Sequence, residues 1–349
     1  MKLLEDLDYN ELTQAVSEGG FPGYRADQLN DMRLRHRDYS EANNLPKAVK
    51  EYFSERYLAQ SVKILETVKG KDAEKYLFLL HDGNIVEGVF MPHNYGNTLC
   101  VSTQVGCRMG CVFCASGLNG LIRNLSAGEI LGEVLAVNAL KGGTPTERAI
   151  GNIVLMGSGE PLDNYDNVVK FLRMIIDPKG LNFGARNISL STSGLADKIK
   201  KLADEKLGIV LSISLHAPTD EQRSALMPVN RSNPISELMA AADYYFKKSG
   251  RRIIFEYALT AQNSDDNSIK QLIKLLKGRC LHVNLINLNY VKERGMSGLS
   301  RKRVDQIVET LNAAGIGATL RRSMGNDIEG ACGQLRNKYL SSTAAEDKA

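Results

Sequence analysis

The chain lacks a long apolar run, a recognisable leader and an internal repeat. No uninterrupted apolar stretch approaches the roughly 18 residues that suggest a membrane span. The opening segment MKLLEDLDYN carries acids where a secretory signal carries bases and an apolar stretch. No self-similarity recurs at a fixed period. We therefore expect a cytoplasmic protein without a membrane segment and without a repeat architecture.

Charge is nearly balanced, and tryptophan is absent. The net charge of +4 is only mildly basic, so composition alone does not indicate a nucleic-acid partner. The hydrophobic fraction of 43% and the charged fraction of 24% are ordinary for a globular protein. A length of 349 residues suffices for one large domain and a smaller one.

Cysteine is used in a cluster rather than in a disulfide framework. Three of the six cysteines, Cys107, Cys111 and Cys114, share one short C-x3-C-x2-C segment, which favours a reducing compartment and a metal. A structural zinc site needs four protein ligands, and no Cys or His follows Cys114 until His216. Three thiolates can instead hold three irons of a [4Fe-4S] cluster and leave the fourth iron open to a small molecule. Zinc with a remote fourth ligand is the alternative.

The pattern of the chain divides it into four parts. Their bounds are 1–60, 61–92, 93–325 and 326–349. The first part is helical and polar, and its basic run Arg33–Arg37 is either a solvated helix face or an RNA contact. The second part has the pattern of a β extension with a hairpin turn at Asp82-Gly83. The last part is a glycine-rich loop and tail.

The third part alternates short apolar β runs with amphipathic helical windows. Its strand candidates are Thr98–Val105, Asn152–Met156, Asn187–Ser191, Gly208–Leu215, Ile253–Leu259, His282–Leu288 and Ala318–Arg321. Ser126-x-x-Glu129 is a capping box, and Ser300 precedes an apolar helical face. Strands separated by helices predict a parallel sheet. We expect an α/β fold, a partial (β/α)6 TIM-like barrel with its site at the carboxyl ends of the strands.

Polar and glycine-rich segments follow several of these strands. Gly159 and Glu160 follow the second strand, where glycine lets the backbone approach a ligand and the carboxylate could accept a hydrogen bond from an ammonium group. The other candidates are Ser191, Ser214, Leu215, His216 and Asn289. Hydroxyls there could bind a cofactor's ribose or carboxylate, and ordinary turn capping explains them as well. His216 alone is more typical of a structural histidine.

Three further cysteines lie outside the triplet. Cys100 is on the first strand, and Cys332 lies in a glycine-rich loop beyond the last strand, which could return it over the barrel mouth. Cys280 is most simply a buried thiol. Glu87, on a strand of the β extension, is most simply a solvent-facing acid.

These segments together resemble the RlmN/Cfr family of radical S-adenosylmethionine RNA methyltransferases. The matching segments are Leu99–Cys107, Arg123–Leu125, Gly159–Leu162, Ser214–Pro218, Asp327-Ile328 and Ala331–Leu335. The resemblance runs from about Tyr24 to Leu335. Pro161 and Ser193 are more similar to the RlmN branch, which methylates carbon 2 of adenosine, than to the Cfr branch, which methylates carbon 8 and is the alternative. The chain departs from the common pattern at Ser158, Asn287 and Gly330 and in having no Trp.

The resemblance implies a radical SAM barrel, a reaction and a set of roles. Cys107, Cys111 and Cys114 would hold the [4Fe-4S] cluster, and two molecules of S-adenosylmethionine would be used per turnover. The first methylates Cys332, and the second yields a radical that converts this methyl group into a methylene bridge to adenine. Cys100 then helps to release the product and forms a disulfide with Cys332. Glu87 matches the position that is assigned as a proton acceptor in the family. The cofactor-binding positions correspond to Gly159, Glu160, Ser191, Ser214, Leu215, His216 and Asn289.

The implied partners are 23S ribosomal RNA, transfer RNA and an electron donor of the flavodoxin or ferredoxin type, with the enzyme a monomer. Arg301–Arg303 and Arg321-Arg322 are candidates for phosphate contacts. The target adenosine has to leave its stack to react. A competing hypothesis is an iron–sulfur or zinc RNA-binding protein without turnover. It leaves Gly159-Glu160, Cys100 and Cys332 without a role.

Overall fold

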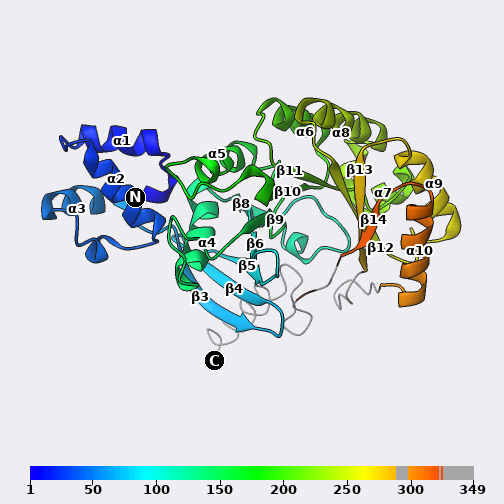
Figure 1. Ribbon diagram of the computed structural model, residues 1–349, viewed down its shortest axis with the longest axis horizontal. Helices are drawn as coiled ribbons and strands as arrows, with labels where there is room; N and C mark the ends of the chain where they lie inside the picture. Colours follow the sequence, from blue (N-terminus) through cyan, green and yellow to red (C-terminus); the bar gives the residue numbers. More distant parts are fainter. Residues whose placement is uncertain (288–297, 322–323, 325–349) are drawn as a thin grey trace.

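The computed structural model describes residues 1–287, 298–321 and 324, and in them a helical N-terminal unit lies beside a sheet-based barrel (Figure 1). Asn289, Arg322 and Cys332 lie outside the described residues. No helix in the described ranges is long and apolar enough to cross a membrane.

A ten-stranded sheet organises the barrel, in the order β14-β13-β12-β11-β10-β9-β6-β5-β4-β3. Its parallel strands are β6 (Thr98–Val101), β9 (Asn152–Leu155), β10 (Ile188–Thr192), β11 (Val210–Ser214), β12 (Ile253–Leu259), β13 (Leu281–Asn287) and β14 (Ala318–Leu320). Each pairs in parallel with the next. The predicted α/β barrel is confirmed. Within the described residues it is open, because β14 and β3 are its two edges.

Three antiparallel strands extend the sheet beyond β6. They are β3 (Val62–Lys69), β4 (Glu74–Leu80) and β5 (Ile85–Met91). The turn at Asp82-Gly83 connects β4 and β5 as predicted, and β5 joins the barrel by pairing Val89 with Cys100. The segment expected as an extension is therefore continuous with the barrel sheet and lines the same concave face.

The single strand expected over Thr98–Val105 is wrong. β6 ends at Val101, and β7 (Gln104–Gly106) pairs instead with β8 (Leu121–Asn124) in a separate two-stranded sheet. The backbone N–H groups of Thr103 and Gln104 donate to the carbonyl of Ser158 at 2.8 and 3.1 Å. These bonds turn the chain out of the main sheet and place the cysteine segment after β7 in front of the barrel (Figure 1).

Helices cover the convex face of the sheet (Figure 1). They are α4 (Ala127–Leu140), α5 (Tyr165–Ile176), α6 (Ala196–Asp204), α8 (Ile235–Ser249), α9 (Asp266–Leu276) and α10 (Arg301–Ala313). The capping box of Ser126 and Glu129 and the N-cap of Ser300 are both confirmed. Because successive strand residues alternate in direction, Leu99 and Val101 pack in the main core under these helices, whereas Cys100 joins a separate cluster on the concave face.

The remaining helical elements are short. They are α7 (Asp220–Leu226) and the 3-10 segments η1 (Leu4–Asp6), η2 (Tyr39–Glu41), η3 (Ala115–Gly117), η4 (Ala185–Asn187) and η5 (Pro228–Arg231). Thr219 caps α7 by accepting from the N–H of Gln222, and Pro228 begins η5 directly after it.

The N-terminal unit has its own core and docks closely on α4. Its elements are β1 (Lys2–Leu3), β2 (Tyr57–Leu58), α1 (Tyr9–Glu18), α2 (Tyr24–Leu34) and α3 (Lys47–Ser54). Leu12, Leu29 and Phe53 are among its fully buried residues. A Cβ on Gly128 of α4 would lie 2.5 Å from the backbone N of Asp6, so this contact requires glycine.

The basic run Arg33–Arg37 is largely structural. Arg33 is buried, donating to Asn30 and to the carbonyl of Leu7. Arg35 pairs with Asp31 at 2.9 Å, and His36 lies 3.0 Å from Glu5. Three of the four basic side chains are therefore engaged within the protein.

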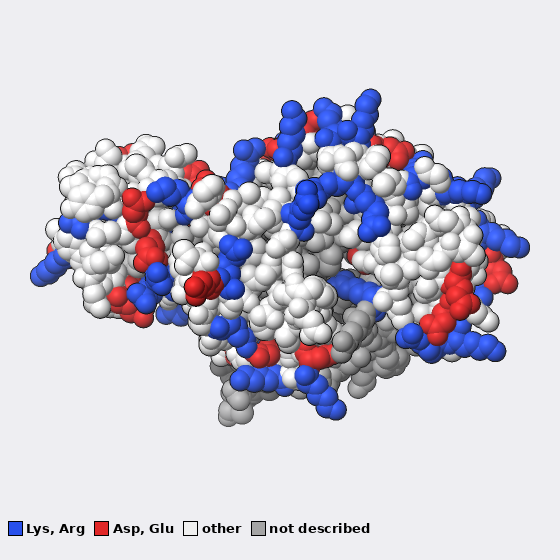
Figure 2. Space-filling model, in the orientation of Figure 1, with Lys and Arg blue, Asp and Glu red and all other residues white. Residues whose placement is uncertain are grey.

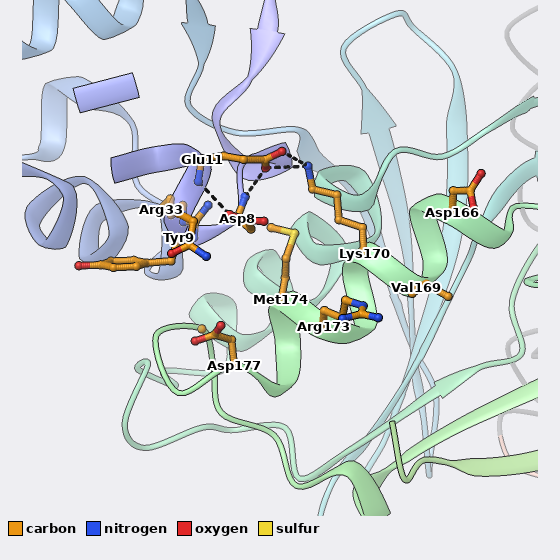
Figure 3. A pocket seen from close by; sticks show the side chains of 12 residues that line it. Asp8, Tyr9, Glu11, Arg33, Asp166, Val169, Lys170, Arg173, Met174 and Asp177 are labelled. Atoms are coloured by element: carbon orange, nitrogen blue, oxygen red, sulfur yellow. Dashed lines mark hydrogen bonds and ion pairs between the residues drawn. The ribbon is translucent and has the colours of Figure 1, made fainter. Parts of the chain in front are cut away.

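A cleft of about 360 Å³ separates the N-terminal unit from α5 (Figure 3). Lys170 of α5 crosses it to pair with Glu11 of α1 at 2.7 Å. Its lining mixes acids and bases and contains none of the candidate cysteines. The cleft marks the junction between the two units and is separate from the cysteine segment.

Candidate active site at the barrel mouth

The three clustered cysteines share the loop between β7 and β8. Gly106 starts this loop at φ 79°, and a Cβ there would lie 2.0 Å from the carbonyl oxygen of Gly120. The N–H of Cys107 donates to that same carbonyl at 3.0 Å. At the far side of the loop Cys111 and Phe113 pack against the buried Met227, which follows α7. The loop is therefore closed at its base and supported at its tip.

Burial makes the isolated thiols poor ligands until a metal takes their protons. It raises the pKa of Cys107 and Cys111 to about 12, and the neighbouring Cys114 and Glu160 act in the same direction. Coordination to iron deprotonates a thiol outright. Among the described residues no group of three His, Cys, Asp or Glu side chains is arranged to hold a single metal ion. A cubane cluster does not need that arrangement, because each cysteine binds a different iron.

Unsatisfied buried hydroxyls beside the loop fit a bound ligand. Thr103 Oγ1 and Ser116 Oγ have no hydrogen-bond partner, although both atoms are buried. Ser116 follows Cys114 by two residues, and Thr103 lies against Gly159, where a Cβ would approach its hydroxyl to 2.8 Å. Buried polar groups normally find partners. The donor set and these atoms together suit a cluster with a small polar molecule beside it.

Glu160 is held under the loop by donors from two segments. It is 3% exposed and accepts from Thr192 Oγ1 at 2.7 Å, the N–H of Ser193 at 2.6 Å and the N–H of Leu162 at 3.0 Å. Burial raises the pKa of Glu160, and these bonds oppose that shift. Gly159 has φ 110°, which only glycine adopts easily. The turn after β9 thus presents a fixed carboxylate close to the cysteines.

The other predicted cofactor positions lie at the neighbouring strand ends. Ser191 and Ser214 are on β10 and β11, half-buried, and Leu215 is fully buried. His216 has φ 55°, and its Nδ1 accepts from the N–H of Ala258 at 2.9 Å. Burial and the nearby Arg223 lower the pKa of His216 to about 3, so the imidazole is neutral. Its ring meets the edge of Phe113 at 4.8 Å between centroids, which links the strand end to the cysteine loop.

Arg223 holds these strand ends together, although no motif marked it. Its guanidinium is buried and donates to the carbonyls of Ser193 at 2.5 Å, Ser214 at 3.0 Å and Leu215 at 3.2 Å. These carbonyls lie at or directly after the carboxyl ends of β10 and β11. The sequence shows only an arginine in a short helix, and nothing in its spacing indicates a buried cation.

Replacing Arg223 with Leu is expected to lower the free energy of unfolding by at least about 3 kcal/mol. Each carbonyl left buried without a donor costs about 1–3 kcal/mol. Urea denaturation measures the change. Arg231→Leu, at the exposed end of η5, is the matched control and should stay within about 0.5 kcal/mol of wild type. Equal effects of the two substitutions would show that Arg223 does not organise the strand ends.

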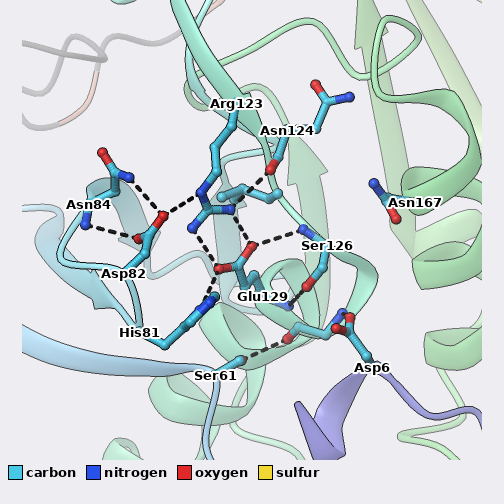
Figure 4. Close-up of polar contacts among 12 residues, drawn as sticks. Asp6, Ser61, His81, Asp82, Asn84, Arg123, Asn124, Ser126, Glu129 and Asn167 are labelled. Carbon is cyan, nitrogen blue, oxygen red and sulfur yellow. Dashed lines mark hydrogen bonds and ion pairs between the residues drawn. The ribbon is translucent and has the colours of Figure 1, made fainter. Parts of the chain in front are cut away.

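A second arginine anchors β8, the strand that follows the cysteine loop. Arg123 on β8 pairs with Asp82 of the hairpin turn at 2.6 Å and with Glu129 of α4 at 2.8 Å (Figure 4). Its hydrogen bond holds the pKa of Asp82 below its usual range. The guanidinium thus connects the hairpin turn, the cysteine loop and α4 through charge-assisted bonds.

The concave face also carries a buried ion pair beside Cys100. Lys75 on β4 and Glu87 on β5 lie 3.2 Å apart, with both side chains buried. Val89 pairs laterally with Lys75 and with Cys100, so the three strands bring these side chains to one surface. The expectation of a solvent-facing Glu87 is wrong, because its strand is covered on both faces.

Lys75→Met is expected to lower the free energy of unfolding by about 3–5 kcal/mol, because it removes the cation from a buried pair. Lys63→Met, on the exposed part of β3, serves as the control and should be nearly neutral. Chemical denaturation of both variants tests this. A loss for Lys75→Met no larger than for the control would mean that the pair contributes nothing to stability.

Comparison with known proteins agrees with this geometry. The Radical SAM superfamily model matches residues 101–276. A protein from Clostridium perfringens strain 13 named "Probable dual-specificity RNA methyltransferase RlmN" is 46% identical over 347 residues, covering 98% of this chain and 99% of its own length. The chain belongs to the RlmN family of radical SAM enzymes. A second RlmN protein, from Thermoanaerobacter sp. strain X514, is 45% identical over 342 residues, with 97% and 98% covered.

A solved structure carries the same fold as this RlmN family member. It is a radical SAM methyltransferase from Sphaerobacter thermophilus, which matches with a TM-score of 0.91 and 40% identity over 96% of this chain and 99% of that one. Membership of the family implies a [4Fe-4S] cluster and S-adenosylmethionine as its cofactors.

The structure brings together most of the residues predicted for the site, and it corrects the expected exposure of two residues, Glu87 and Cys280. The cysteine triplet, Glu160 and His216 meet at the mouth, and Cys100 and Glu87 share the concave face. Cys280, expected to be buried, is exposed in the turn before β13. Asn289 and Cys332 fall outside the described residues. Their roles remain predictions.

Proposed function

We propose that the protein methylates carbon 2 of adenosine in 23S ribosomal RNA and in transfer RNA, in the cytoplasm, through an S-methylcysteine at Cys332. Cys107, Cys111 and Cys114 hold the cluster, which when bound supplies the electron that cleaves S-adenosylmethionine to a 5′-deoxyadenosyl radical. The cofactor-binding residues are Gly159, Glu160, Ser191, Ser214, Leu215, His216 and Asn289. Two molecules of S-adenosylmethionine are used per turnover. A flavodoxin- or ferredoxin-type protein provides the electrons.

The position of Cys100 carries this proposal. It is 7% exposed on the concave face, in a cluster that includes Val154, Met156 and Met324. Met324 precedes Cys332 by eight residues, a segment that spans at most roughly 28 Å when extended. A chain that starts beside Cys100 can therefore bring Cys332 back to it. Two cysteines within reach of each other suit a carrier and a resolving thiol.

The protein's own groups can perform the remaining steps. Carbon 2 of adenine is electron-poor and does not attack a sulfonium methyl, whereas a carbon radical can add to it. The methylene radical carried by Cys332 forms the new bond to carbon 2, and Glu87 accepts the proton that carbon 2 loses. The one electron left over would return to the cluster held by the cysteine triplet. The Cys100 thiolate then attacks the sulfur of Cys332 and breaks the sulfur–carbon bond. The released carbon takes the bonding electron pair and a proton from solvent to become the methyl group, and a disulfide is left for external reduction.

Charge near the mouth supports an RNA substrate. Figure 2 shows a hollow in the face of the barrel with Lys and Arg side chains along its edge. Arg321, which follows β14, is exposed, and so is Arg108 of the cysteine loop, although Arg108 pairs with Asp163. Within Arg301–Arg303, however, Arg301 pairs with Asp305 and Arg303 with Asp266, so Lys302 is the better phosphate contact. Cationic side chains beside a pocket attract RNA phosphates irrespective of sequence.

Mass spectrometry of RNA nucleosides tests the proposal. Ribosomal and transfer RNA from cells with and without the protein should differ in 2-methyladenosine, and Pro161 and Ser193 favour that isomer. Mainly 8-methyladenosine would assign the protein to the Cfr reaction. No difference in either nucleoside, with iron and sulfide present in the purified protein, would favour the RNA-binding alternative without turnover.

A further inference from the structure

A row of polar residues crosses the concave face below the mouth. Ser214, Glu256, Asn284 and Thr319 stand in lateral register on β11, β12, β13 and β14. Their strand neighbours Ile213, Phe255 and Leu285 belong to the main core under the helices. The row therefore faces the interior of the barrel, where apolar side chains would otherwise be expected.

One oxygen of Glu256 is fixed, and the other has no partner. Oε1 accepts from Asn284 Nδ2 at 3.1 Å. Asn284 Oδ1 in turn accepts from Thr319 at 3.3 Å, and that hydroxyl lies 2.8 Å from His282 Nε2. The carboxylate is thus oriented from the side of β13. Oε2 is buried and makes no hydrogen bond, although the residue is only 3% exposed.

Glu256 is also tied to the strand end proposed to bind the cofactor. The N–H groups of Leu215 and His216 donate to the backbone carbonyl of Glu256 at 3.0 and 3.3 Å. Burial raises the pKa of Glu256. The positive charge of Arg321, which follows β14, acts in the opposite direction and favours the ionised carboxylate. Its guanidinium also lies 3.6 Å from the sulfur of Met156 at the end of β9. An acceptor of fixed direction therefore faces the space between these strand ends.

We propose that Glu256 is a specificity-determining residue that accepts a hydrogen bond from a ribose hydroxyl of the nucleoside cofactor. The inference rests on the proposed function, which places that cofactor beside Ser214. A buried carboxylate is matched by an O–H or N–H donor, and the ribose supplies two adjacent O–H groups. The lateral pairing of Glu256 with Ser214 favours the cofactor ribose over the ribose of the RNA target.

Equilibrium binding to the iron–sulfur-reconstituted protein tests this. The probes are S-adenosylhomocysteine and its 2′-deoxy and 3′-deoxy analogues, measured by calorimetry without RNA. Wild type should bind the parent roughly ten- to a hundredfold more tightly than one of the analogues, as expected for a hydrogen bond to a charged group. In Glu256→Ala this ratio should fall to within about threefold.

Two further variants keep the test decisive. Glu256→Gln retains an acceptor for Asn284 and removes the charge. It should therefore fold, and its affinities for the parent compound and the deoxy analogues should differ less than those of the wild type. Glu133→Gln is the control, because Glu133 of α4 is also buried with one unpartnered oxygen but lies on the convex side. It should keep the wild-type ratio. A wild-type ratio of affinities in both Glu256 variants would overturn the proposal.

Failure of the proposed function is separately visible. If the protein discriminates the analogues through Glu256 but never methylates RNA, the role of Glu256 is correct and the proposed RNA reaction is wrong. If the protein methylates RNA and all variants discriminate the analogues equally, the proposed reaction is correct and the role of Glu256 is wrong.

Discussion

Cys100→Ala is expected to accumulate RNA covalently attached to the protein, and to release little methylated RNA. Cys332 still receives its methyl group in this variant, and the methylene still adds to adenine. The thiolate that breaks the sulfur–carbon bond is missing, so the reaction stops at the linked species. The complex should appear as a slowly migrating band in denaturing gels that nuclease treatment removes.

Two controls define this result. Cys280→Ala removes an exposed thiol in the turn before β13 and should behave as wild type. The double variant Cys100→Ala, Cys332→Ala has no methyl carrier and should form no band. Near-normal turnover by Cys100→Ala would show that this thiol, which is 7% exposed, serves only for packing.

Replacing any one of Cys107, Cys111 and Cys114 with Ala should reduce 5′-deoxyadenosine formation by more than roughly a hundredfold. Loss of residues that merely support a metal ligand costs about 10–100-fold, and loss of a ligand itself costs more. The fold should persist, because the loop closes through the bond from the backbone N–H of Cys107 to Gly120 and through packing of Phe113.

Iron content and circular dichroism separate the two effects. Each variant should bind less iron than Cys280→Ala prepared in parallel, with an unchanged far-ultraviolet spectrum. Undiminished 5′-deoxyadenosine production by any of the three purified variants would contradict the assignment of the cluster to this loop.

The architecture could be predicted because local signals and the sheet agree. The capping box of α4 and the N-cap of α10 marked the starts of these helices. The alternation of apolar runs predicted strands to within one or two residues, such as Ile253–Leu259 for β12. The exception is the run Thr98–Val105. Its apolar alternation continues through the break, and the bonds to the carbonyl of Ser158 that end β6 come from a segment more than fifty residues away.

The site was predictable where chemistry depends on residue type and spacing. The cysteine triplet and Gly159-Glu160 are such cases. Arg223, Lys75 and Glu256 were missed, because each is a charged residue whose role comes from burial beside groups on other strands. Cys280 shows the reverse error, since a thiol between a helix and a strand can face solvent. The division into four parts stays a prediction, and the continuity of β5 with β6 shows that the boundary at 92 crosses one sheet.

The central claim is that the methyl group reaches RNA through Cys332, and a deuterium label tests it most directly. With S-adenosylmethionine that carries a CD3 group, one deuterium atom should pass to 5′-deoxyadenosine when the methyl group on Cys332 is converted to the methylene radical. The RNA methyl group should then retain two deuterons and gain one hydrogen from solvent. Mass spectrometry of the methylated adenosine distinguishes the outcomes. A CD2H group agrees with the carrier, and an intact CD3 group would mean direct transfer without it.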